Sequence, residues 1–432
     1  MPRFASRRGT SRRTASGLVL VSCMFALVFV AYGIYPAYIQ GQQNLQASQT
    51  ISQQFGSDLQ RALKPVLIIS VYKSSTDHTL IHKYVDKNDL ILAPVLSFFE
   101  AWFGANSLGG AVQITATDTG GGSRTFDLTD TSSLCTSSAQ TVICNTTLGL
   151  TGSTIQLGTG VCVPARTDTA LCSPFQVAVG TGQAGYSTTT GNVTMSSTIV
   201  SSSTATISET GMIMNWGDSG GSLRNVLFFH DSFSGFGVVN GNVIVIQYVL
   251  ELNNTGFTNA FGEALALIFS SVTTSQRETN PYPNVLDTGG NSEALPIQYA
   301  ETAVTFLVQP SSVDTPIIQI GIGSAAVARS QNSLATSTCS TNKIQEPITT
   351  LATSTLILQA GVSCPSPQTI READLIQYMP ALSGTVYFMV WRATFTGVPV
   401  GAGATIGVSW NLIFNTILPS IFCIPTVARS CG

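Results

Sequence analysis

Charged side chains are scarce in this sequence. They make up 9% of the 432 residues, while hydrophobic residues make up 44%; an average globular protein has about 25% charged residues. Five of the 19 lysines and arginines lie within the first 13 positions, which leaves 14 against 22 aspartates and glutamates. This composition excludes a disordered polar chain, and the acidic balance argues against nucleic-acid binding by the main part of the protein.

Residues typical of metal and cofactor sites are also few. The three histidines, His78, His82 and His230, are widely separated, and the sequence has no Cys-x-x-Cys motif. Leu157-Gly158-Thr159-Gly160 lacks the third glycine of a dinucleotide-binding loop. We therefore expect no metal site, no cofactor and no catalytic residues.

One long uncharged run is present near the N-terminus. Residues 17–39 are apolar and long enough for the roughly 20 residues that cross a bilayer. Because five arginines precede the run, residues 1–16 are expected to form a basic cytoplasmic tail, with the rest of the chain outside. The alternative is a cleaved signal peptide, whose apolar region is usually shorter, about 7–15 residues.

The same segment resembles a type IV pilin N-terminus. It combines a basic leader, an apolar helix and the step Pro36-Ala37-Tyr38. The resemblance implies cleavage near Ala15 and a filament subunit. Thr14 and the lack of an early glutamate in the apolar run depart from the pilin pattern.

The main part of the chain is an internal duplication. Ile155-Gln156-Leu157-Gly158-Thr159-Gly160 returns 163 positions later as Ile318-Gln319-Ile320-Gly321-Ile322-Gly323, and at the same offset Glu209 matches Glu372. Further on the offset becomes 162, where Ile244 matches Ile406. A repeat of this length is a domain, so chemistry present in one copy alone is not the reason for the fold.

Both copies are predicted to be β-rich. Short runs of Val, Ile and Thr alternate with Gly, Ser and Asn, a pattern typical of antiparallel sandwiches or jelly rolls. Every second residue is apolar from Ile244 to Leu252 and from Ile406 to Phe414, so one face of these strands belongs to the core. Phe98 and Phe261, 163 positions apart, place a short helix at the head of each copy.

These patterns give a predicted domain organisation. Ile51, Phe55, Leu59 and Leu63 recur every four residues, as in an amphipathic helix, which acts as a stalk or packs in an oligomer. The predicted units are a transmembrane helix at 17–39, a stalk helix at 40–65, a connecting segment at 66–92, β-sandwich copies at 93–254 and 255–420, and a disulfide-tied tail at 421–432.

The cysteines favour an oxidising compartment. Copy two has Ala325 and Ala335 in place of Cys162 and Cys172, and copy one has Gln176 and Ser201 in place of Cys339 and Cys364. Cysteines that are present or absent in pairs indicate disulfides; zinc is the disfavoured alternative. We expect disulfides Cys162–Cys172 and Cys339–Cys364, and less firmly Cys135–Cys144 and Cys423–Cys431. The glycosylation candidates on the outer side are Asn145, Asn192 and Asn253.

Two charged residues survive the duplication together. Arg166 and Glu209 match Arg329 and Glu372. We predict that each pair forms a structural ion pair, because isolated carboxylates need partners. The alternative is a carboxylate site present twice.

The duplicated unit resembles a β-rich module of phage and archaeal-virus surface and tail proteins. The resemblance runs through Thr117-Asp118-Thr119-Gly120-Gly121, Ile155 to Leu171, Thr206 to Gly211 and Arg224 to Phe233. It implies a structural role without an active site.

One motif points to an enzyme. Gly217-Asp218-Ser219-Gly220-Gly221-Ser222 resembles the nucleophile loop of chymotrypsin-like serine peptidases, with His82 and Asp127 in the matching order. However, copy two has Met379-Pro380-Ala381-Leu382-Ser383-Gly384 there, and Asp-Ser-Gly-Gly is also common in turns. We therefore expect a membrane-anchored structural or adhesive surface protein, a virion spike or shell component or a cell-surface fibre subunit, whose partners are the membrane through residues 17–39 and other copies or surface proteins.

Overall fold

The chain is mainly β in the part that the structure describes. The computed structural model describes residues 64–87, 90–104, 113–127, 152–177, 184–218, 222–252, 256–269, 282–295, 317–337, 339, 342–343, 348–350, 355–381 and 384–413. The predicted transmembrane helix, residues 17–39, lies outside these ranges. Within them, no helix is long and apolar enough to cross a membrane.

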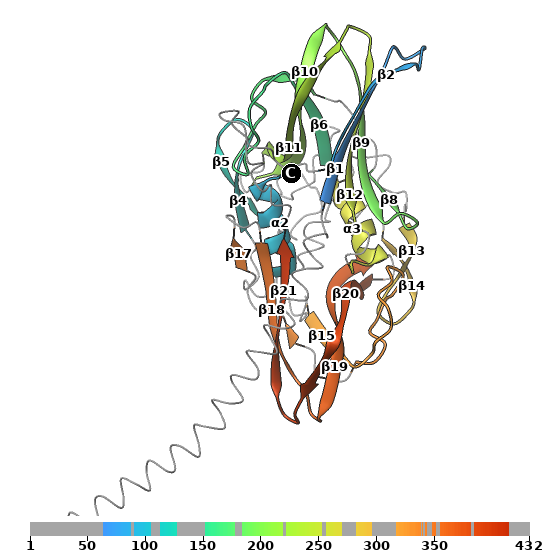
Figure 1. Cartoon of the computed structure of the whole chain (residues 1–432). Helices are drawn as coiled ribbons and strands as arrows, with labels where there is room; N and C mark the ends of the chain where they lie inside the picture. The colour runs from blue at the N-terminus through green and yellow to red at the C-terminus, as the bar shows by residue number, and fades with distance from the viewer. Residues whose placement is uncertain are drawn as a thin grey trace, which may run out of the picture.

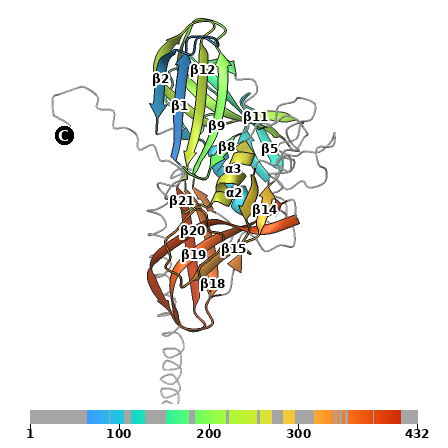
Figure 2. The same ribbon diagram turned by 90° about the vertical axis from the view of Figure 1, so that its right-hand side faces the viewer.

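The first copy forms two five-stranded antiparallel sheets that face each other (Figures 1 and 2). The first sheet has the order β2-β1-β12-β9-β8, with β2 Leu80–Asp86, β1 Lys64–Tyr72, β12 Val243–Glu251, β9 Asn192–Val200 and β8 Gly185–Ser187. The second has the order β3-β11-β10-β6-β7, with β3 Leu90–Ile91, β11 Leu223–Val238, β10 Ala205–Gly217, β6 Gly152–Gly158 and β7 Pro174–Val177. Across the two sheets, the rings of Phe229 and Tyr248 lie 5.5 Å apart.

Sequence reasoning placed the first copy too far along the chain. The segment 66–92, expected to be a connection, contributes most of β1 and all of β2 and β3 to the two sheets. The apolar run from Val66 to Val71 pairs along β12. A repeat search misses this pairing because the run lies before the stretch that the repeat aligns.

The second copy repeats most of this pairing. One sheet has the order β16-β15-β19-β20, with β16 Asn342–Lys343, β15 Ile317–Gly321, β19 Gln368–Ala381 and β20 Gly384–Val400. The other has the order β17-β18-β21, with β17 Ile348–Thr350, β18 Thr355–Ser363 and β21 Thr405–Ile413. The alternation predicted for β12 is confirmed, since Ile244, Ile246 and Tyr248 are fully buried.

Irregularities in the sheets repeat as well. The register between β10 and β11 shifts between Ile207 and Glu209 and again between Met212 and Ile213. Between β19 and β20 it shifts between Ile370 and Glu372 and between Leu375 and Ile376, each 163 positions later. A bulge re-aims the side chains beside it, so the duplication preserved the orientation of the glutamate that follows the first bulge.

A small hairpin accompanies each copy. The hairpins are β4 Gln113–Thr117 with β5 Ser123–Asp127, and β13 Tyr282–Leu286 with β14 Ser292–Leu295. At the tips, the Thr119 amide donates to the Asn225 carbonyl of β11, and the Thr288 amide donates to the Tyr387 carbonyl of β20, both at 2.8 Å. The hairpins therefore dock on equivalent strands.

Two helices join the copies. The predicted short helices are present as α2 Ala93–Gly104 and α3 Asn259–Phe269. Each packs against a long strand of its own copy and against the other copy: α2 contacts β11 together with β17 and β18, and α3 contacts β20 together with β8 and β9. Each helix thus packs against strands of the other copy as well as its own.

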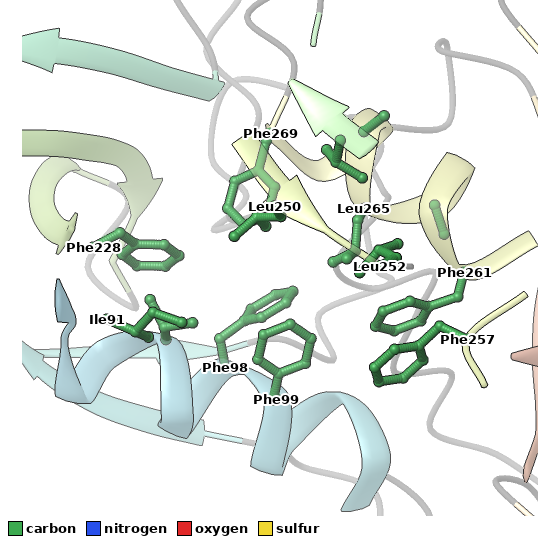
Figure 3. Packing of buried hydrophobic residues seen from close by; sticks show 14 of the residues in the cluster. Ile91, Phe98, Phe99, Phe228, Leu250, Leu252, Phe257, Phe261, Leu265 and Phe269 are labelled. Atoms are coloured by element: carbon green, nitrogen blue, oxygen red, sulfur yellow. The ribbon is translucent and has the colours of Figure 1, made fainter. Parts of the chain in front are cut away.

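The two helices make the core continuous. Figure 3 shows Phe98 and Phe99 of α2 facing Phe257 and Phe261, and the Phe99 and Phe261 rings lie 6.4 Å apart. One cluster of buried side chains extends from Leu67 in the first copy to Val408 in the second. The two copies therefore share one hydrophobic core.

Candidate functional site

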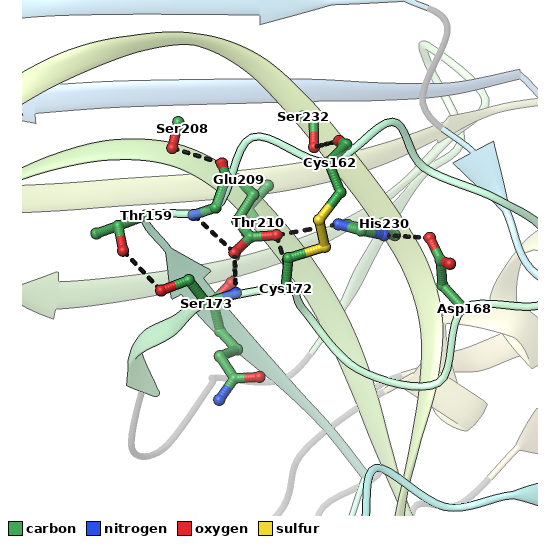
Figure 4. A network of polar contacts seen from close by, with 12 residues as sticks. Thr159, Cys162, Asp168, Cys172, Ser173, Ser208, Glu209, Thr210, His230 and Ser232 are labelled. Carbon is green, nitrogen blue, oxygen red and sulfur yellow. Dashed lines mark hydrogen bonds and ion pairs between the residues drawn. A yellow bond between two sulfur atoms is a disulfide. The ribbon is translucent and has the colours of Figure 1, made fainter. Parts of the chain in front are cut away.

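A buried glutamate organises the loop that follows β6. The bulge in β10 turns Glu209 under residues 159–173 (Figure 4), and its side chain is 0% exposed. Oε1 accepts hydrogen bonds from the amides of Gly160 at 2.9 Å and Ser173 at 2.7 Å, and Oε2 accepts one from Cys172 at 3.1 Å. Backbone amides that converge on a carboxylate compensate its loss of water.

The glycines of the repeated Gly-x-Gly motif make this approach possible. A Cβ on Gly158 or Gly160 would collide with the carboxylate of Glu209. On Gly321 or Gly323 it would collide with that of Glu372. The motif is therefore a carboxylate cradle.

Copy two builds the same cradle. Glu372 Oε1 accepts hydrogen bonds from the amides of Gly323 at 2.9 Å and Thr336 at 3.0 Å, and Oε2 accepts one from Ala335 at 3.3 Å. Each partner lies 163 positions after its copy-one equivalent. Burial raises the pKa of Glu372, but the hydrogen bonds from Arg392 and from these amides outweigh burial and leave the pKa below its ordinary value.

The cation beside the cradle differs between the copies. In copy two, Arg392 Nη2 lies 2.6 Å from Glu372 Oε2 and its Nη1 donates to Gln331 Oε1 at 2.6 Å. In copy one, His230 takes that place, with Nε2 3.3 Å from Glu209 Oε2 and Nδ1 2.7 Å from Asp168 Oδ2.

The predicted ion pairs Arg166–Glu209 and Arg329–Glu372 are wrong. Arg166 Nη1 donates to the carbonyl of Ile91 at 3.4 Å, and Arg329 Nη2 donates to the carbonyls of Thr188 and Thr189 at 3.0 Å. Both arginines lie in the loop that Glu209 or Glu372 caps, but they point out of it. The true partners, His230 and Arg392, were missed because they differ in type, although they align at the offset of 162.

Two predicted disulfides are confirmed: Cys162–Cys172 and Cys339–Cys364. In copy one, Gln176 replaces the second disulfide by hydrogen bonds, donating to the Val200 carbonyl at 2.8 Å and accepting from the Ser202 amide at 3.2 Å. The other predicted pairs, Cys135–Cys144 and Cys423–Cys431, lie outside the described residues.

The Asp-Ser-Gly-Gly motif begins at a hairpin turn. Asp218 Oδ1 accepts the Ser222 amide at 2.8 Å, and Oδ2 accepts Arg224 Nε at 2.6 Å. Asp118 makes the same two contacts, with Gly122 at 2.8 Å and Arg124 at 2.7 Å. The aspartate of the motif is therefore a turn residue.

The other members of the peptidase-like set lie apart. His82 on β2 stacks on Phe236, with ring centroids 4.5 Å apart. Asp127 ends β5, in a different sheet. Ser219 lies outside the described residues.

Of the glycosylation candidates, Asn145 and Asn253 lie outside the described residues. Asn192 begins β9, and its Oδ1 is buried without a hydrogen bond. Nothing in these contacts identifies a glycan.

The chain was compared with known protein families, curated proteins and solved structures. No protein-family model, curated protein or solved structure matches this chain.

Proposed function

We propose that this chain is a membrane-anchored structural or adhesive surface protein. Residues 17–39 cross the membrane, the segment between them and the start of β1 at Lys64 forms a stalk, and two tandem jelly-roll-like β sandwiches stand outside. Two disulfides among the described residues support an oxidising location. The five arginines before the apolar run support the orientation.

The observation that carries a structural role is the use made of the polar groups that both copies keep. Glu209 and Glu372 bind loop amides, and Asp118 and Asp287 hold the tips of equivalent hairpins. In each case the carboxylate contacts the protein's own backbone amides and neighbouring side chains. These carboxylates are needed to hold the loops and hairpins in place, which is a sufficient reason for both copies to keep them. We therefore infer that the protein acts through its surface and its assembly.

The partners in this proposal are other copies of the chain or other surface proteins, as in a virion spike, a virion shell or a cell-surface fibre. A pilin-like filament subunit is the alternative carried by residues 1–40. The N-terminal residue of the mature protein distinguishes them: cleavage near Ala15 supports the filament subunit, and an intact N-terminus supports the anchor.

Protease treatment of intact cells or particles tests the orientation. We expect the β region to be released while the arginine-rich tail stays protected. Detergent-permeabilised samples are the control, because both parts then become accessible. Digestion of the tail with protection of residues 66–432 contradicts a surface function.

A fluorophosphonate probe tests the structural role against the peptidase. We expect no labelling of Ser219, since a reactive serine needs a histidine base and oxyanion donors. Labelling that disappears in Ser219→Ala and persists in Ser222→Ala contradicts the proposal.

A further inference from the structure

We propose that copy one holds a zinc site in its thiol form, made by Cys162, Cys172, His230 and Glu209. The ligand atoms of Cys162, Cys172 and Glu209 lie within 4.8 Å of one another. His230 Nε2 lies 3.3 Å from Glu209 Oε2. Cys162 and Cys172 are bonded to each other in the structure, so a metal can bind only after reduction. The freed sulfurs can then turn apart to the roughly 3.3–3.8 Å that separates the ligands of a tetrahedral zinc ion, with His230 as the fourth ligand beside Glu209.

The histidine is oriented as metal-binding histidines are. Its Nδ1 lies 2.7 Å from Asp168 Oδ2, and the ring is fully buried. A carboxylate on one ring nitrogen fixes the other nitrogen toward a metal. Figure 4 shows the ring between Asp168 on one side and Glu209 with the two cysteines on the other.

The site needs a positive charge. When Nδ1–H donates to Asp168, a neutral His230 turns a lone pair of Nε2 toward the Glu209 carboxylate. Both side chains are 0% exposed, so water does not relieve the repulsion. In the thiol form a divalent cation satisfies Nε2, Oε2 and both sulfurs at once.

Copy two supports the assignment because it lacks both cysteines and the histidine together. Ala325, Ala335 and Arg392 stand where copy one has Cys162, Cys172 and His230, while Glu372 is retained. The Arg392 guanidinium bonds to the Glu372 carboxylate and donates to the Ala325 carbonyl at 3.2 Å. A fixed cation therefore replaces the ligands in copy two.

The donor set selects the metal. Two thiolates, an imidazole and a carboxylate in a tetrahedral arrangement suit zinc, whereas magnesium and calcium require oxygen ligands. The disulfide uses the same two sulfur atoms, so metal binding and disulfide formation exclude each other. The thiol form exists before oxidation of the new chain, or after treatment with a phosphine reductant. The inference does not rest on the proposed surface function.

Metal titration of the full chain in detergent tests the site. Phosphine-reduced protein is expected to bind one zinc ion per chain, and Co²⁺ in its place should show thiolate charge-transfer absorption. Oxidised protein is expected to bind none. Equal zinc binding by the oxidised and reduced forms overturns the proposal, as does its absence from the reduced form.

Matched variants locate the site. Cys162→Ala with Cys172→Ala should abolish binding, whereas Cys339→Ala with Cys364→Ala, which removes the same number of thiols, should retain it. Asp168→Asn should weaken binding by about 10- to 100-fold, as expected when a metal-bound histidine loses its supporting carboxylate.

A fold-preserving variant completes the test. Converting Cys162, Cys172, Asp168 and His230 to Ala, Ala, Gln and Arg reproduces the copy-two arrangement and should fold without binding zinc. The proposal fails if this variant, shown to be folded by circular dichroism, still binds one zinc ion with thiolate-type cobalt absorption in place of Zn²⁺.

Discussion

At the scale of single residues, the cradle glutamates show how a scarce charge is used. Glu209 and Glu372 are fully buried, and each accepts three backbone hydrogen bonds. The paired glycines are small because a carboxylate occupies the volume that a methyl group would fill. These glycines leave room for the carboxylate, and a turn conformation alone does not explain why they are glycines.

Gly160→Ala is therefore expected to destabilise the protein. The new Cβ meets the carboxylate of Glu209 and lies 2.8 Å from Cys172 Cβ, and overpacking of this kind costs about 1–3 kcal/mol. Chemical denaturation measures the loss. Gly237→Ala is the control, since its Cβ meets nothing within 4 Å; equal losses in the two variants contradict the cradle.

Glu263 on α3 gives a second prediction, on pH. Burial raises its pKa to about 7, and its Oε2 has no hydrogen bond. Between the ordinary pKa of about 4.5 and about 7, the unfolded chain has lost a proton that the folded chain keeps, so the free energy of unfolding falls as pH rises through this window. The total contribution is about 3 kcal/mol.

Glu263→Gln should remove most of this fall. The measurement is the free energy of unfolding at about pH 5 and about pH 7.5, which bracket most of the pH range over which Glu263 is expected to lose its proton in the unfolded or the folded chain. Glu251→Gln, at an exposed position, is the control and should leave the pH dependence unchanged. An unaltered slope in Glu263→Gln would show that the side chain ionises in the folded state.

At the scale of elements, the two copies connect equivalent segments with different kinds of bond. Cys339–Cys364 ties the loop after β15 to the end of β18, and the hydrogen bonds of Gln176 tie the equivalent places in copy one. A disulfide that closes a loop of this size contributes about 3 kcal/mol, whereas a net hydrogen bond contributes about 1 kcal/mol.

Replacing Cys339 and Cys364 by serine should therefore lower the free energy of unfolding by about 3 kcal/mol. Gln176→Ala should lower it by about 1–2 kcal/mol. Urea denaturation of the oxidised proteins compares them. A larger loss for Gln176→Ala than for the double serine variant contradicts this comparison.

At the scale of the whole molecule, the two helices determine how the protein unfolds. Phe261 of α3 stacks on Phe257 at 4.1 Å and faces Phe99 of α2. Because each helix packs on both copies, neither copy buries its apolar surface alone. The two copies should form one cooperative unit, unlike tandem domains with separate cores.

Phe261→Ala tests this cooperativity. Loss of a buried phenylalanine costs about 3–5 kcal/mol, and hydrogen exchange should accelerate in β9 and β20 alike. Val161→Ala, at a position 86% exposed, is the control and should change neither. Acceleration confined to one copy, or two separate calorimetric transitions in the wild-type chain, would contradict the shared core.

The sequence by itself determined the duplication, the β content, the two short helices and two disulfides, because alternating apolar residues and the paired loss of cysteines are local or repeated signals. The tertiary structure decided the partners of Glu209 and Glu372, which lie on neighbouring strands at positions set by β-bulges. It also decided the packing of each helix against both copies and the place of β1 beside β12. These contacts join residues that are far apart in the sequence, and their spacing along the chain does not show which of them will touch.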